Sequence, residues 1–117
     1  MTKTSKKKIK VVYNNGKLEF KEIESEKFDE VIIDDKIIKL YIHRSIYNNK
    51  RWAITEEATG LFLKDNLKNK IEARKQYDEY LKGKLIDFIK NKYKQYLKAI
   101  KQFNEILNNK NEDKTIY

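Results

Sequence analysis

Cysteine and proline are absent from this sequence, and it contains only three glycines and one histidine. The absence of cysteine excludes disulfides and thiolate metal sites. A single histidine leaves no His/Asp cluster with metal-ligand spacing, and no glycine-rich phosphate loop is present. We therefore predict that the protein uses no metal ion and no other cofactor.

Long hydrophobic runs are also missing. No uninterrupted apolar segment approaches the roughly 18 residues that a membrane-spanning helix needs. Residues 1–10 are rich in lysine and threonine and lack the apolar core of a signal peptide. These absences predict a cytoplasmic protein with no membrane partner.

Acidic residues are the minority among the charged ones, 18 against 27 lysines and arginines, which gives a formal net charge of +9. Such a surplus favours a polyanionic partner such as DNA or RNA. The chain is also rich in lysine, asparagine and isoleucine, as are proteins from AT-rich genomes. A surplus that only maintains solubility is therefore the alternative.

Two runs of alternating apolar residues flank Asn15-Gly16 and predict a β-hairpin. Asn-Gly favours a type I′ turn, which needs a positive φ at both central residues. With a two-residue loop, Tyr13 faces Leu18 and the apolar side chains of both strands share one face.

The rest of the first half predicts an antiparallel meander. A turn at Asp34-Asp35 separates two strands, and the loop 48–50 would set Ile46 against Trp52 in the core. The expected segments are a flexible basic arm at 1–8, an acidic connection at 22–30, and strands at 31–33, 36–46, 51–55 and 61–63.

A long amphipathic helix is predicted from Asp65 to about Asn109, capped by Asp65 or Asn66 and bent or broken at Gly83. Apolar and aromatic residues recur there at spacings of three and four, which forms one stripe on an α-helix. The stripe consists of Ile86, Ile89, Tyr93, Tyr96, Ile100, Phe103 and Leu107.

The stripe is wider than a coiled-coil seam, and the only charges beside it, at the e and g positions, are Lys90 and Lys92. We therefore expect the helix to cover the sheet of a monomer, with a homodimeric coiled coil as the alternative. The predicted fold is one α+β domain over 9–109, with five or six antiparallel strands at 9–63 packed on helix 65–109. Residues 110–117 form a polar tail.

Catalysis is not supported by these residues. None of the serines lies in a nucleophile-elbow context. The adjacent acids Asp34-Asp35 and Glu56-Glu57 lie in turns, where their side chains would diverge or point to water, unlike a converging acid–base pair. We predict that the protein is not an enzyme.

Two groups of residues are the candidate binding sites for a nucleic acid or another partner. Four lysines of the helix gather opposite the stripe and could follow phosphates, although a solvated face would have the same pattern; they are Lys84, Lys94, Lys98 and Lys101. Residues of the meander's outer face could stack on bases or anchor a protein, although cross-strand pairs are the alternative. The candidates are Lys84, Lys90, Lys94, Lys98 and Lys101 on the helix, and Tyr41, His43, Tyr47, Lys50 and Arg51 on the meander.

The segments His43-Arg44-Ser45, 51–56 and Thr59-Gly60, followed by a helix with Lys70 and Ala73, form a W-x-[VI]-[ST]-E…T-G hairpin plus helix. This pattern resembles small proteins of bacteriophages and other mobile elements. The resemblance implies an anti-CRISPR-like inhibitor that binds a host nucleoprotein effector in the bacterial cytoplasm. A plain nucleic-acid-binding protein and a helix-mediated homodimeric assembly protein are the alternatives.

Overall fold

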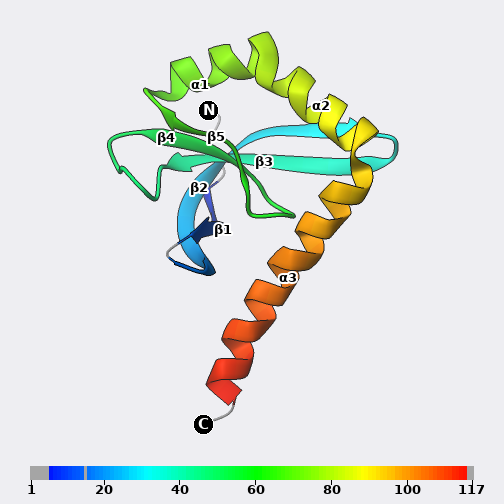
Figure 1. The fold of residues 1–117 in the computed structure, drawn as a ribbon. Coiled ribbons are helices and arrows are strands. Elements are labelled where there is room, and N and C mark those ends of the chain that lie inside the picture. The colour runs from blue at the N-terminus through cyan, green and yellow to red at the C-terminus, as the bar shows by residue number, and fades with distance from the viewer. Residues whose placement is uncertain (1–5, 15, 116–117) are drawn as a thin grey trace.

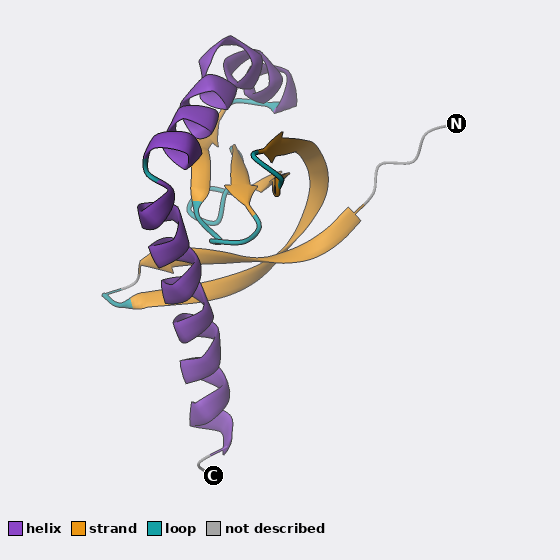
Figure 2. Ribbon diagram, turned by 90° about the vertical axis from the view of Figure 1, so that its right-hand side faces the viewer, coloured by secondary structure: helices purple, strands orange, loops and turns teal. Residues whose placement is uncertain are grey.

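The protein is an antiparallel five-stranded sheet, in the order β1-β2-β3-β4-β5, covered by successive helical segments. The computed structural model describes the backbone of residues 6–14 and 16–115, with side chains to residue 108. Helices α1 and α2 arch over the sheet, and α3 runs along one side of it and continues beyond (Figures 1 and 2). The α+β prediction is thus confirmed. The elements are β1 (Lys6–Asn14), β2 (Leu18–Ile33), β3 (Lys36–Arg44), β4 (Trp52–Glu56), β5 (Phe62–Leu67), α1 (Lys70–Gln76), the π-helix η1 (Tyr77–Leu81), α2 (Lys82–Asn91) and α3 (Tyr93–Thr115).

Strand β2 includes the acidic stretch 22–30, so the prediction of a connection there is wrong. The reason is charge pairing, because glutamates of β2 lie directly opposite lysines of β1 and such cross-strand pairs stabilise a sheet. The opposed pairs are Lys6 and Glu26, Lys8 and Glu24, and Lys10 and Glu22. Lysines 6–8 are therefore strand residues and not part of a basic arm; residues 1–5 lie outside the described part.

The first hairpin has a register one residue away from the predicted one. Asn14 pairs with Leu18, so Tyr13 faces Glu19 and not Leu18. In this register Val11 is fully buried, and the amide of Val12 donates to the carbonyl of Gly60 at 2.8 Å. Contacts of β1 with distant residues thus override the two-residue turn.

The second hairpin has the predicted turn, because Asp34 and Asp35 both have positive φ and Ile33 pairs with Lys36. Upstream of that turn, the pairing of β2 with β3 shifts between Lys27 and Asp29, which leaves Phe28 as an extra residue in a β-bulge. A bulge bends its strand, and the first half of β2 turns away with β1.

Because of this bend, both faces of β3 are covered by other parts of the chain. Ile38, Leu40 and Ile42 are buried in the main core, as predicted. The opposite face was expected to be solvated, but Tyr41 and His43 are also buried. A second, smaller core encloses that face, and its buried members are Ile9, Val11 and Tyr41.

The β3–β4 loop is longer than predicted and spans residues 45–51. Arg44 pairs with Trp52, so the expected pairing of Ile46 with Trp52 is wrong. The hydroxyl of Ser45 accepts hydrogen bonds from the amides of Tyr47 and Asn48, which ends the strand. Trp52 is half-buried against the main core, and the guanidinium of Arg44 lies 4.1 Å from its ring centroid.

The long helix is divided, and its first turn begins later than predicted. Asp65 and Asn66 belong to β5, and Asn69 is the N-cap, accepting from the amide of Glu72 at 2.7 Å. The break falls at Lys92, which has φ −130° and ψ 40°, whereas Gly83 lies inside α2. Helix α3 extends to Thr115, into the segment that was expected to be a tail.

A four-residue repeat of buried side chains explains the π-helix. In an α-helix each four-residue step overshoots a full turn by about 40°, so a repeat of four drifts around the helix. The wider π turn, with its i→i+5 hydrogen bonds, reduces that drift and keeps the row on the sheet. The row consists of Ala73, Tyr77, Leu81, Leu85 and Ile89.

The predicted stripe of 86–107 does face the sheet, because all seven of its residues are buried or half-buried. The helical layer as a whole is therefore the cover of the sheet. Not every apolar residue of the layer is covered, because Ile71 of α1 is 81% exposed.

We expect Gly60→Ala to lower the free energy of unfolding by at least about 2 kcal/mol. Gly60 has φ +67°, and a Cβ atom there would lie 2.6 Å from the ring of Phe103. Gly83→Ala is the matched control, because its Cβ would meet nothing within 4 Å. It should raise the free energy of unfolding by about 0.5–1 kcal/mol. Urea denaturation measures both, and equal shifts would contradict the close approach of Gly60 to α3.

Candidate partner-binding surfaces

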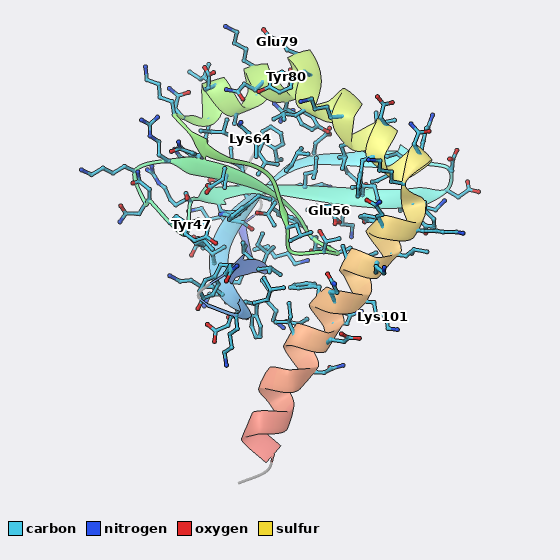
Figure 3. The ribbon with its side chains drawn as sticks, viewed as in Figure 1. Tyr47, Glu56, Lys64, Glu79, Tyr80 and Lys101 are labelled. Atoms are coloured by element: carbon cyan, nitrogen blue, oxygen red, sulfur yellow. The ribbon has the colours of Figure 1, made fainter. Side chains whose placement is uncertain are left out.

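Three of the predicted helix lysines form one exposed row on α3. Lys94, Lys98 and Lys101 are separated by four and three residues, which places them on the same face of a helix. Figure 3 shows Lys101 on the side of α3 turned away from the sheet. All three side chains are exposed, so this row is available to a partner.

The other two helix lysines lie on α2, before the break at Lys92. Lys90 is exposed and lies four residues before Lys94, on the other side of the break. Lys84 is also exposed, but its ammonium lies 5.3 Å from the centroid of the Tyr80 ring and borders a cavity beside β5. The sequence predicted that Lys84 shares one face with Lys94, Lys98 and Lys101. The break at Lys92 instead separates Lys84 from those three lysines.

Positive charge is segregated between the two layers. Residues 6–67 contain 13 basic and 11 acidic residues, whereas residues 68–108 contain 11 basic and 5 acidic ones. Among the side chains that the structure describes, every ion pair lies within residues 6–78. The lysines of α2 and α3 thus carry the charge that internal pairs do not offset. We define Lys94, Lys98 and Lys101 as the lysine surface.

The predicted cluster on the meander does not form a single surface. Tyr41 and His43 are buried, Arg51 is half-buried, and only Tyr47 and Lys50 are exposed. The hydroxyl of Tyr47 accepts from the amide of Asn14 at 3.3 Å. Tyr47 therefore links the end of β1 to the β3–β4 loop, and its ring is the one aromatic ring of the cluster that is exposed.

His43 is a buried structural residue, and only 1% of its surface is exposed. Its Nδ1 donates to the carbonyl of Arg44 at 2.7 Å, and its Nε2 accepts from the hydroxyl of Thr55 at 2.6 Å. Burial lowers the pKa of His43, while the Arg44 carbonyl and the nearby Asp65 carboxylate oppose that shift. The imidazole is therefore neutral and acts as a buried hydrogen-bonding link between β3 and β4.

Glu56 corrects the expectation that the acids of this turn point to water. It is 5% exposed, and its carboxylate accepts from the amides of Ala58 and Thr59 at 2.8 and 3.0 Å. Burial raises the pKa of Glu56, while these amides and the hydroxyl of Tyr96 oppose the shift by hydrogen bonding. Its neighbour Glu57 pairs with Lys7 at 2.6 Å. Both acids hold the β4–β5 turn in place.

A cavity of about 470 Å³ lies between β5 and the helices, a volume in the range of ligand-binding pockets. Sequence reasoning missed it, because its walls come from three separate parts of the chain. We call it the β5 groove; Figure 3 labels Glu56, Lys64 and Tyr80 around it. It is lined by Glu56, Thr59, 61–64, Tyr80, Leu81, Lys84, Leu85, Phe88, Tyr96 and Ala99.

Three further searches bear on function. Within the described residues, no group of three or more histidine, aspartate or glutamate side chains is placed to hold a metal ion. No helix in that part of the chain combines the length and apolar character needed to cross a membrane. Comparison with family models, curated proteins and solved structures found no match to this chain. The lysine surface and the β5 groove are the two surfaces of the described residues that a partner could contact.

We expect His43 to contribute less to the free energy of unfolding as the pH decreases from 7 to 5. Unfolded His43 takes up a proton near its ordinary pKa of 6.5, whereas the folded residue, with its lowered pKa, takes up less. As the pH decreases, the free energy of unfolding falls wherever the unfolded state binds more protons than the folded state. For one group the fall is at most about 1.4 kcal/mol per pH unit. Urea denaturation at several pH values should show that the wild type loses more stability than His43→Gln over this range.

The contribution of Glu56 to the free energy of unfolding changes with pH in the opposite direction. Its pKa is raised, so above pH 4.5 the folded state binds more protons than the unfolded state. That contribution is common to the wild type and to His43→Gln, so the difference between them isolates the histidine. Parallel pH profiles for the two proteins would show that His43 is not buried in its neutral form.

Proposed function

We propose that this protein is a non-enzymatic accessory protein that binds a nucleoprotein, with its lysine surface in contact with nucleic-acid phosphates. The observation that carries this proposal is the segregation of charge. Lysines 94, 98 and 101 form an exposed row, and no ion pair of the described side chains includes them. A row of unpaired cations suits a polyanion better than a neutral partner.

The dimensions of the row fit backbone contacts. Seven residues of α-helix separate Lys94 from Lys101, a distance of about 10 Å along the axis. Double-stranded DNA carries one negative charge per about 1.7 Å of its axis, so each lysine meets a phosphate without reading sequence. The expected recognition is therefore of shape and charge, not of bases.

The mobile-element resemblance provides the biological setting of the proposal. In that setting the target is the nucleic-acid component of a host defence effector in the bacterial cytoplasm, and binding inhibits it. We also propose that the protein acts as a monomer. Support comes from the apolar stripe, because Ile89, Tyr96 and Phe103 are already buried within the same chain.

We expect the triple substitution Lys94→Glu, Lys98→Glu and Lys101→Glu to abolish most binding to random-sequence RNA and duplex DNA. Fluorescence anisotropy across a series of salt concentrations measures this. Each lost phosphate contact should make the slope of log K against log salt shallower by about 0.7–0.9, so the variant should differ by about 2–3.

The matched control changes three exposed lysines of the sheet layer, Lys17, Lys21 and Lys27, to glutamate. This control has the same net charge as the test variant but keeps the row on α3, so its salt slope should stay close to that of the wild type. The proposal fails if the wild type binds neither nucleic acid at low salt, or if the control loses as much affinity as the test variant.

A further inference from the structure

We propose that the β5 groove binds an extended acidic–apolar segment of a protein partner, which adds to the sheet as a strand along the free edge of β5. This inference goes beyond the proposed contact with nucleic acid. It concerns a different surface, and it stands or falls independently of the lysine surface.

The first wall of the groove is the edge of a strand. Four consecutive residues line it: Leu61, just before β5, and residues 62–64 of β5. Side chains alternate between the two faces of a strand, so a cavity on one face would touch every second residue. Contact with all four places the groove along the edge, and in the described part of the sheet β4 is the sole neighbour of β5. A strand edge presents the amides and carbonyls that an added strand uses.

The opposite wall is one face of a helix. Its residues are separated by steps of one, three and four along η1 and α2, which is the pattern of a single helical face. They are Tyr80, Leu81, Lys84, Leu85 and Phe88. The outer members remain accessible, with Tyr80 39% and Phe88 37% exposed, and Leu61 across from them is 46% exposed. An exposed strand edge facing an apolar helix is therefore ready to hold an extended segment and its side chains.

The charges at the groove select an acidic partner. Lys64 contributes from β5 and Lys84 from α2, and both side chains are exposed. The carboxylate of Glu56 also lines the cavity, but the amides of Ala58 and Thr59 already bind both of its oxygens. It is thus committed to the turn, and the two lysines remain to pair with acidic side chains of the partner.

Charge also disfavours a second copy of this chain as the occupant. Antiparallel pairing of two β5 edges would bring the Lys64 residues of both copies into one groove region beside the Lys84 residues. Like charges across paired strands are destabilising. A partner strand that alternates acidic and apolar residues avoids this repulsion and fills the apolar walls.

The test uses an array of labelled nine-residue peptides that alternate Asp or Glu with Val, Leu, Ile or Phe. We expect saturable binding by members of this set, and none by the same peptides with lysine at the acidic positions. In ¹H–¹⁵N NMR spectra, binding should shift the amides of 61–67 and slow their hydrogen exchange. Methylation of alternate peptide amides should abolish binding, because it removes the donors that an added strand needs.

The double substitution Lys64→Glu and Lys84→Glu should weaken binding by about tenfold. The matched control, Lys98→Glu with Lys101→Glu, makes the same change in net charge outside the groove and should leave affinity within about twofold. The control variant should at the same time weaken nucleic-acid binding. The peptide and nucleic-acid measurements therefore show separately whether each proposal fails. The inference is overturned if no acidic peptide binds, if methylated peptides bind equally well, or if the 61–67 amides are protected by self-association of the protein alone.

Discussion

The hydrogen bond from the buried hydroxyl of Tyr77 to the carboxylate of Asp29, at 2.5 Å, joins the helical layer to the strand that bends. Tyr77 is 1% exposed, and its ring packs edge-on against Phe28, the extra residue of the β2 bulge, with centroids 5.0 Å apart. Loss of Asp29 would leave the buried hydroxyl of Tyr77 without its hydrogen-bond partner. This contact fixes the bulge at which β2 bends and the helix that lies above it.

The bend at Phe28 determines how charge is distributed over the molecule. Because β2 continues past the bulge, its glutamates meet the lysines of β1, and the sheet layer is nearly neutral. The helical layer has no such counterpart, since its inner face is occupied by apolar residues. Its lysines therefore face solvent and carry the surplus that the proposed contact with nucleic acid requires.

The groove has its origin in the same geometry. The repeat of Tyr77, Leu81 and Leu85 holds η1 and α2 over the main core, and the break at Lys92 lets α3 turn down the side of the sheet. Because β5 has β4 as its one neighbour in the described sheet, its outer edge is left beside these helices. Two surfaces of different chemistry, one cationic and one apolar with a cationic rim, thus lie on the helical side of one small domain.

The sequence by itself determined the features that depend on local patterns: the α+β class, the Asp34-Asp35 turn, and the stripe of 86–107 that faces the sheet. It also identified the exposed row of Lys94, Lys98 and Lys101, because helical spacing alone places them together. Only the tertiary structure decided the burial of His43, since a bend in β2 far along the chain covers that face. The hairpin register, the break at Lys92 and the groove likewise depend on contacts between distant residues, whose packing and hydrogen bonds outweigh the local propensities of a turn or a glycine.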